Sequence, residues 1–251
     1  MWQQMVIVFC FYLEKDVVMN LIKKLVQKYG HIWTALYLPV YLIWFFKLER
    51  DVTREYTVIH CFIDDYIPFC EYFIVPYLLW FLMIPVMWLY LFFKDKKEFY
   101  QHIIFLYSGM TLFLIICTIF PNGQDMRPVF NPTENIFTEL IAVLYRSDTS
   151  TNVFPSIHVF NSLAFYIAVR KNKTLNHNLV IRIGSLILTV SICLATVFLK
   201  QHSVLDGIGA GVLAMVLYYF VYVKPEKSTY ALKEKKKVKA RKHSLQDNFF
   251  Y

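Results

Sequence analysis

Hydrophobic positions in this chain gather into long runs that alternate with short polar segments. A helix needs roughly 20 consecutive apolar residues to cross the hydrocarbon core of a bilayer, and six of the runs approach that length. They cover residues 32–46, 69–93, 102–120, 154–169, 178–199 and 204–223. The pattern predicts an all-α integral membrane protein built as a bundle of six transmembrane helices.

The two ends of the chain follow different patterns. Within residues 1–30, apolar positions recur at helical spacing between lysines. This predicts an amphipathic helix that lies either on an anionic membrane surface or against the bundle. Residues 224–251 form a basic tail. We therefore expect three parts: an N-terminal segment (1–30), a six-helix membrane domain (31–223) and a cytoplasmic tail (224–251).

Composition supports the membrane assignment. Hydrophobic residues make up 57% of the chain, which excludes an ordinary soluble protein. Aromatic residues make up 18%, as expected where Trp and Tyr side chains line both membrane surfaces. The net charge of +8 comes largely from the tail and from short loops between apolar runs. This distribution favours contact with membrane lipids, and we expect no nucleic-acid partner.

Charge also predicts how the bundle is oriented. The loops at 94–97 (KDKK) and 170–173 (RKNK) are basic, whereas the long segment 121–153 holds only two basic residues. Cytoplasmic loops are rich in Lys and Arg. Both termini of this multi-pass protein are therefore expected in the cytoplasm and segment 121–153 outside. Cys61 and Cys70 would share an external loop, where they either pair or remain separate thiols.

A His and an Asp stand four residues apart where the last apolar run begins. If the chain is helical from Ser203 onward, His202 and Asp206 share one face, and the carboxylate can accept a hydrogen bond from the imidazole. A carboxylate so placed fixes the ring tautomer and increases the basicity of the other nitrogen, which suits a nucleophile or general base. The alternative is a capped helix start with a satisfied histidine.

A second polar cluster, FPSIH, occupies residues 154–158. Pro155 at a helix start leaves neighbouring backbone N–H groups free, and the Ser156 hydroxyl adds a further donor, which predicts an anion site. His158 falls in the first turn of the helix, where it could donate a proton to a bound group.

Other candidates belong to the same predicted face. Arg127 lies in the long external segment, and Lys200 is a candidate phosphate partner, with attraction to lipid headgroups as the alternative for both. Asn131 is expected to cap a short helix whose apolar residues recur from 136 to 144. We predict that this helix covers the outer surface of the bundle.

The glycines of the GIGAG sequence at 207–211 lie inside a predicted span. Since they follow no strand, they do not form a nucleotide-binding loop. Gly207 and Gly211 are instead expected to let neighbouring helices approach closely.

Three short motifs follow one another along the chain: R-P, then P-S-x-H, then H-x3-D. Together they resemble the three motifs of the type 2 phosphatidic acid phosphatase superfamily. The match covers residues 120–211. The resemblance implies a six-helix membrane fold whose motifs meet at the external membrane face and remove or transfer a phosphoryl group, with no metal or other cofactor.

The resemblance also implies roles for single residues. His202 corresponds to the nucleophile that forms a phospho-histidine, and Asp206 to the residue that orients it. His158 corresponds to the acid that protonates the leaving alkoxide. Arg127 and Ser156 correspond to residues that hold the phosphate.

Some positions depart from the family pattern. Phe120 stands where the first motif has a Lys, Ile157 replaces a Gly, and Ala195 and Thr196 replace a Ser-Arg pair. Lys200 is a candidate for the missing cation. The departures resemble the branch that contains inositol-phosphorylceramide and sphingomyelin synthases, which pass a phospho-headgroup to another alcohol.

The leading expectation is a membrane enzyme that hydrolyses a lipid phosphate, either phosphatidate-like or a polyprenyl (pyro)phosphate. One alternative is transfer of a lipid headgroup between alcohols. The other is a catalytically silent membrane protein of the same fold, such as a transporter or scaffold. The presence of both histidines and the aspartate favours an enzyme.

Overall fold

The structure is a computed structural model that describes residues 19–20, 23–24, 26–51 and 55–227. Most of the predicted amphipathic segment 1–30 and of the basic tail therefore lies outside the described residues. The chain divides into two compact units, Met1–Val40 and Tyr41–Tyr251. The described part is mostly helical and has almost no sheet, so the all-α class is confirmed.

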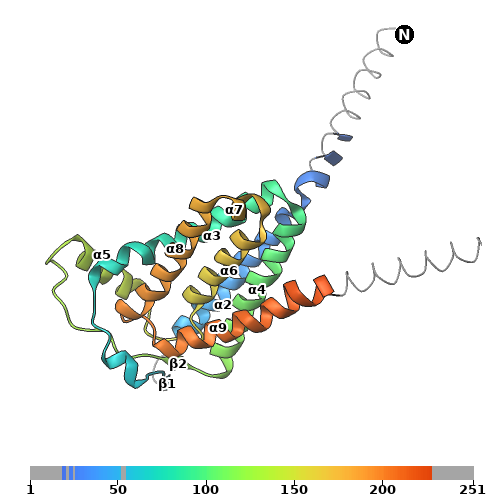
Figure 1. Cartoon of the computed structure of the whole chain (residues 1–251). Coiled ribbons are helices and arrows are strands. Elements are labelled where there is room, and N and C mark those ends of the chain that lie inside the picture. The colour runs from blue at the N-terminus through green and yellow to red at the C-terminus, as the bar shows by residue number, and fades with distance from the viewer. Residues whose placement is uncertain (1–18, 21–22, 25, 52–54, 228–251) are drawn as a thin grey trace, which may run out of the picture. The chain divides into compact units, whose positions relative to one another are not determined.

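The first unit holds a 3₁₀ helix, η1 (Gly30–Leu36), and the start of helix α2 (Tyr37–Asp51). The second unit contains the longer helices that follow (Figure 1). These are α3 (Ile74–Lys94), α4 (Lys96–Ile119), α5 (Ile136–Ser147), α6 (Ile157–Lys171), α7 (Lys173–His177), α8 (Leu179–Phe198) and α9 (Val204–Tyr218). Shorter elements join them: η2 (Phe62–Asp65), η3 (Glu71–Phe73), the π-helical turn η4 (Tyr219–Val223), and the parallel pair β1 (Thr57–Val58) and β2 (Asn122–Gly123).

Helices long and apolar enough to cross a membrane account for most of the predicted spans. Within the described residues they number five: Val26–Asp51, Glu71–Lys94, Lys96–Ile119, Leu179–Phe198 and Val204–Lys227. Their outward faces carry large exposed apolar side chains, such as Val86 (61% exposed) and Val180 (80%). Exposing such large apolar surfaces to water is unfavourable. The helices therefore indicate a multi-pass membrane protein.

Helix α6 takes the place of the predicted fourth span, but it differs from the other five. Its 15 residues extend over about 22 Å at the usual helical rise, which is less than the roughly 30 Å of the hydrocarbon core. It packs against α3, α4, α8 and α9, which surround it (Figure 1). Since neighbouring helices cover its sides, α6 can carry buried polar residues such as Asn161 and Ser162.

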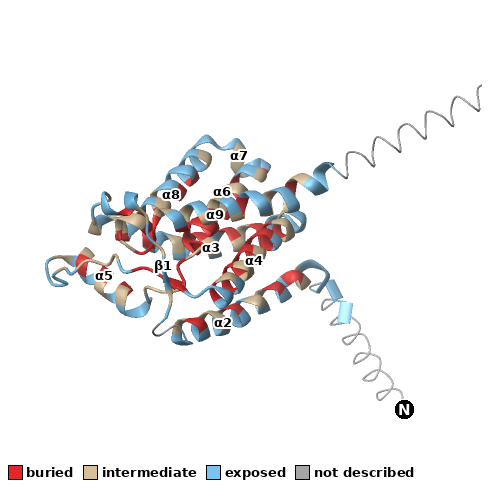
Figure 2. Ribbon diagram, turned by 90° about the horizontal axis from the view of Figure 1, so that it is seen from below, coloured by how far each residue is buried: buried red, intermediate tan, exposed pale blue. Residues whose placement is uncertain are grey.

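The core lies between the helices that surround α6. Figure 2 shows the buried residues gathered on the facing sides of these helices and the exposed residues outside. Phe160 of α6 lies so close to Gly109 of α4 that a Cβ at Gly109 would stand 2.0 Å from its ring. Glycine at this position therefore allows the two helices to pack together.

The basic loops lie at one end of the bundle. Nδ2 of Asn172, after α6, donates a hydrogen bond to Oε2 of Glu98 in the first turn of α4 (2.6 Å). Nζ of Lys171 pairs with Glu226 beyond α9 (3.3 Å). The first turns of α6 and α9, which hold the candidate chemical groups, begin at the opposite end.

Helix α5 begins later than expected. Its N-cap is Asn135, whose Oδ1 accepts hydrogen bonds from the backbone N–H groups of Phe137 and Thr138. Asn131, the predicted cap, accepts instead from Thr133 in a local turn. The sequence pattern failed here because either Asn can bond to an N–H group two residues later, and only Asn135 is followed by helix.

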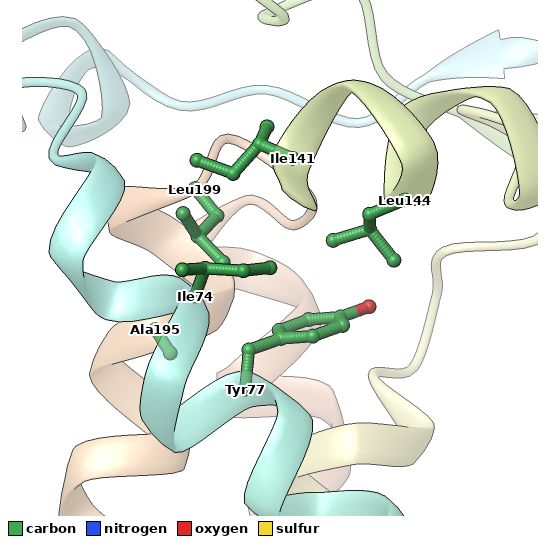
Figure 3. Packing of buried hydrophobic residues seen from close by; sticks show 6 residues of the cluster. All are labelled: Ile74, Tyr77, Ile141, Leu144, Ala195 and Leu199. Atoms are coloured by element: carbon green, nitrogen blue, oxygen red, sulfur yellow. The ribbon is translucent and has the colours of Figure 1, made fainter. Parts of the chain in front are cut away.

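The apolar face of α5 packs onto the bundle. Ile141 and Leu144 join a buried cluster, which Figure 3 shows in detail. Its other members are Ile74 and Tyr77 of α3, Ala195 of α8 and Leu199. This packing holds α5 against the start of α3 and the end of α8.

The prediction for the glycines of α9 was wrong in its positions. A Cβ at Gly207 would meet its nearest neighbour at an ordinary 3.8 Å, and one at Gly211 would meet open space. Gly209 makes the close approach, because a Cβ there would stand 2.5 Å from the Phe154 ring. The contact between α9 and the loop before α6 therefore requires glycine at position 209, which lies between the predicted positions 207 and 211.

Candidate active site

His202 and Asp206 meet at the start of α9, as their spacing predicts. Ser203 is the N-cap of α9, and its backbone N–H donates a hydrogen bond to Oδ2 of Asp206 (2.9 Å). The same oxygen lies 3.1 Å from Nδ1 of His202. Both side chains are buried, Asp206 completely. The two interpretations of this motif are therefore compatible, because one oxygen both caps the helix and contacts the histidine.

His158 completes a row of three groups. Its Nδ1 lies 3.2 Å from Nε2 of His202, across a sequence separation of 44 residues. Its ring lies against Tyr77 and Trp80 of α3, with centroids 4.7 and 4.3 Å apart. An ionised Asp206 only accepts hydrogen bonds, so Nδ1 of His202 is the donor to it and Nε2 faces His158 with its lone pair.

Ser156 is the N-cap of α6, and its surroundings correct one expectation. Its backbone N–H donates to the carbonyl oxygen of Asp206 (3.0 Å), and its Oγ accepts from the N–H of Val159 (3.4 Å). These two amides of the predicted anion site are thus occupied within the protein. The hydroxyl hydrogen of the fully buried Ser156 is the remaining donor of that side chain.

Arg127 is brought to the site but is held mainly by backbone carbonyls. Its Nη1 donates to the carbonyls of Tyr145 and Asp148, and its guanidinium lies over the Tyr145 ring, 4.4 Å from the centroid. Its Nη2 donates to the carbonyl of Thr149 (2.8 Å) and to Oε1 of Gln201 (2.5 Å). Arg127 therefore links the end of α5 to the residue that precedes His202.

Lys200 turns away from the row of His158, His202 and Asp206. Its Nζ donates to the carbonyl oxygen of Asp64 (2.7 Å), and its own carbonyl accepts from Gln124 (2.8 Å). The sequence analysis gave a bound phosphate or lipid headgroups as the candidate partners of Lys200. The contact in the structure is with a backbone carbonyl oxygen instead.

Asp64 is a buried residue that the sequence interpretation missed. Its carboxylate accepts from the Ser203 hydroxyl and from the N–H groups of Val204 and Cys61. Burial alone would raise the pKa of Asp64, but these hydrogen bonds outweigh it and lower the pKa. In the sequence, Asp64 was only one acidic residue of an external loop, and its neighbour Asp65 is exposed. Cys61 and Cys70 are both free thiols.

Asp148 was also missed. Burial and the nearby Glu49 carboxylate raise the pKa of Asp148 to about 6, against the opposing charges of Arg127 and His202. Glu49, from α2, accepts a hydrogen bond from Nδ2 of Asn152 (2.6 Å). The surroundings of the histidines are thus rich in carboxylates as well as in donors.

Asn122 organises the chain that enters α6. It is fully buried, and its Oδ1 accepts from the N–H groups of Val153 and Phe154 (2.9 and 2.7 Å). The sequence interpretation recognised only a turn at 121–123, whereas this side chain fixes the segment that leads to Ser156.

Among the described residues, no group of three or more His, Cys, Asp or Glu side chains is arranged to hold a metal ion. Comparisons with protein-family models, curated proteins and solved structures find no match to this chain. Any functional assignment must therefore rest on the site itself.

Proposed function

We propose that this chain is a membrane enzyme that transfers the phosphoryl group of a lipid phosphate through a phospho-histidine at His202. Its motifs resemble those of the type 2 phosphatidic acid phosphatase superfamily. The observation that carries the proposal is the row Asp206–His202–His158, with contacts of 3.1 and 3.2 Å. A carboxylate, a nucleophilic nitrogen and a second proton-carrying group in a row form the arrangement that covalent catalysis requires.

In the first half-reaction, Nε2 of His202 attacks phosphorus, the N–P bond forms and the P–O bond to the lipid breaks. Asp206 stabilises the positive charge that develops on the ring and keeps Nδ1 protonated. His158 enters this step as an imidazolium, gives one proton to the leaving lipid alkoxide and is left neutral. The lipid departs as an alcohol.

In the second half-reaction, His158 accepts a proton from water while the water oxygen attacks phosphorus. The N–P bond breaks and inorganic phosphate leaves. Arg127 contributes positive charge at the edge of the site, and the Ser156 hydroxyl contributes a donor. Phosphoryl transfer depends mainly on such positioning and charge.

The site's place in the bundle fits a lipid substrate. It lies at the ends of α6 and α9 that are opposite the basic loops, where headgroups would meet the protein. By the charge rule this end is external and both termini are cytoplasmic.

Headgroup transfer from a phosphodiester lipid is the second candidate. Its support is the charge around the site: the Lys200 ammonium contacts a carbonyl oxygen, and Asp148 and Glu49 lie beside Arg127. Such surroundings suit the single charge of a diester better than the double charge of a monoester. The phosphorus on His202 then carries the headgroup, and an alcohol attacks it in place of water.

The test is turnover by the detergent-purified protein, offered a panel of lipid monophosphates and diphosphates. We expect phosphate release that is lost in His202→Ala and kept in His177→Ala, which changes an exposed histidine at the other end of the bundle. If no phosphate is released, a labelled phosphodiester lipid and an alcohol acceptor test transfer. Absence of both activities would support a silent membrane protein.

A further inference from the structure

Gln201 is a buried side chain in the short segment between α8 and α9. It directly precedes His202, and only 3% of its surface is exposed. Its backbone N–H and that of His202 both donate to the carbonyl of Thr196 in α8 (3.0 Å each). The position of Gln201 relative to His202 is therefore fixed by the backbone as well as by sequence.

The orientation of the Gln201 amide is determined by Arg127. A guanidinium only donates hydrogen bonds, so the atom 2.5 Å from its Nη2 must be the amide oxygen. The amide nitrogen, Nε2, is then a donor, and it has no hydrogen-bond partner among the residues that the structure describes. Nε of Arg127 is a second buried donor without a partner in the described part of the chain.

A buried donor without an acceptor destabilises the fold, so native proteins seldom keep one without use. Here the two donors belong to side chains that are hydrogen-bonded to each other. One of these residues, Gln201, directly precedes His202 in the sequence. The guanidinium of Arg127 is positively charged, whereas the amide of Gln201 is neutral. A ligand with several acceptor oxygens would satisfy both donors together.

We infer that Gln201 is a phosphate-binding residue, whose Nε2 donates to a non-bridging oxygen of the phosphoryl group while Nε of Arg127 donates to another. This inference rests on the proposed function. It gives the site a neutral donor on the residue that precedes His202, whereas the ammonium of the expected cation, Lys200, donates to the carbonyl oxygen of Asp64. None of the motifs that suggested the site includes Gln201.

Gln201→Glu is the sharpest test, because it preserves the shape of the side chain. The new carboxylate still pairs with Arg127, but it replaces the N–H donor by a second negative oxygen. Gln101→Glu makes the same change in α4, near the basic end of the bundle, and is the matched control. Gln201→Met keeps the volume and removes both hydrogen bonds, and it carries the test if Gln201→Glu does not fold.

The probes are inorganic phosphate and vanadate, titrated into the purified protein and also used as inhibitors of turnover. We expect Gln201→Glu to weaken both affinities at least about tenfold, as for loss of a hydrogen bond to a charged group, with the unfolding temperature kept. Gln101→Glu should bind like wild type. Wild-type affinity in Gln201→Glu would overturn the inference.

The outcomes separate this inference from the proposed function. If wild type turns over lipid phosphates through His202, and Gln201→Glu binds phosphate equally well, only the role of Gln201 is wrong. If wild type neither binds phosphate nor turns over any lipid phosphate or diester, the inference and the proposed function both fail. A fall in unfolding temperature without a change in affinity would make Gln201 purely structural.

Discussion

The backbone N–H of Ser156 donates a hydrogen bond to the carbonyl oxygen of Asp206, at 3.0 Å. This bond joins the N-cap of α6 to the first turn of α9. Each of the two residues also supports a histidine of the candidate site: Ser156 precedes His158 by two positions, and Asp206 contacts His202. A single backbone contact thus aligns two helix starts that are far apart in the sequence.

Asp206 has two roles that substitution can separate. In Asp206→Asn the amide oxygen can still cap Ser203, but the side chain no longer stabilises a charged His202. We expect turnover to fall by roughly a thousandfold or more while the unfolding temperature stays near that of wild type. Asp206→Ala should lose the cap as well, at a cost of about 1 kcal/mol.

Turnover kinetics and thermal unfolding in one detergent check this prediction. Asp125→Asn changes an exposed carboxylate of segment 121–153 and serves as the control. Equal activity in Asp206→Asn and wild type would remove Asp206 from the mechanism.

Asp64 is expected to stabilise the start of α9. Asp64→Ala removes the acceptor for Ser203 and Val204, so we expect about 1–2 kcal/mol of lost stability and slower turnover. Because the folded-state pKa of Asp64 is lowered, its contribution is present above the ordinary carboxyl pKa of about 4 and is lost as the pH falls through the lower, folded-state value.

Unfolding temperatures measured from pH 7 downward test this behaviour, with Asp125→Ala at an exposed carboxylate as the control. The Asp64→Ala deficit should be constant near neutrality and shrink only in acid. A deficit that is the same at every pH would mean that the charge of Asp64 does not matter.

Asp148 has the opposite pH dependence. Its pKa is raised to about 6 by burial and by Glu49, so the folded state holds this proton more tightly than the unfolded state does. Its ionisation therefore destabilises the fold as the pH rises from about 4 through 6. Asp148→Asn should unfold at a higher temperature than wild type at pH 8, and the difference should vanish near pH 4.

Heating curves at pH 4, 6 and 8 provide this comparison. A lower unfolding temperature for Asp148→Asn at pH 8 would show that attraction to Arg127 outweighs the cost of burying the carboxylate.

The local part of the site could be predicted from sequence, because it depends on helical spacing. His202 and Asp206 are four residues apart, and a helix that begins at Val204 brings them together. The hydrogen bond between Ser203 and Asp64 joins residues 139 positions apart and depends on how the loop that holds Asp64 folds back. No periodicity in the sequence indicates which acidic residue of that loop becomes buried.

The fold shows the same division. Apolar length predicted the long helices. Helix α6 differs from expectation because of packing, whereas α5 begins later because Asn135 caps it in place of Asn131. The polar and aromatic residues of α6 are covered by surrounding helices, which hydropathy alone does not reveal. Arg127 was identified, but its bond to Gln201 depends on the path of the chain after α5.

Gly209 should be sensitive to substitution because of its contact with Phe154. Gly209→Ala places a Cβ 2.5 Å from the Phe154 ring, so the ring and the segment that leads to Ser156 must move. We expect a loss of about 1–3 kcal/mol, typical of overpacking, and reduced turnover. Gly211→Ala, on the same helix, meets open space and should be neutral or stabilising by up to about 1 kcal/mol.

The orientation of the bundle can be tested through Cys61, a free and partly exposed thiol of the loop that holds Asp64. With the other cysteines replaced, a membrane-impermeant thiol reagent should label Cys61 in intact cells. In the matched chain, where Cys61 is also replaced and His177→Cys supplies the single thiol at the basic end, labelling should require lysis. The reverse result would place the candidate site on the cytoplasmic face, where its substrate would be a lipid of the inner leaflet.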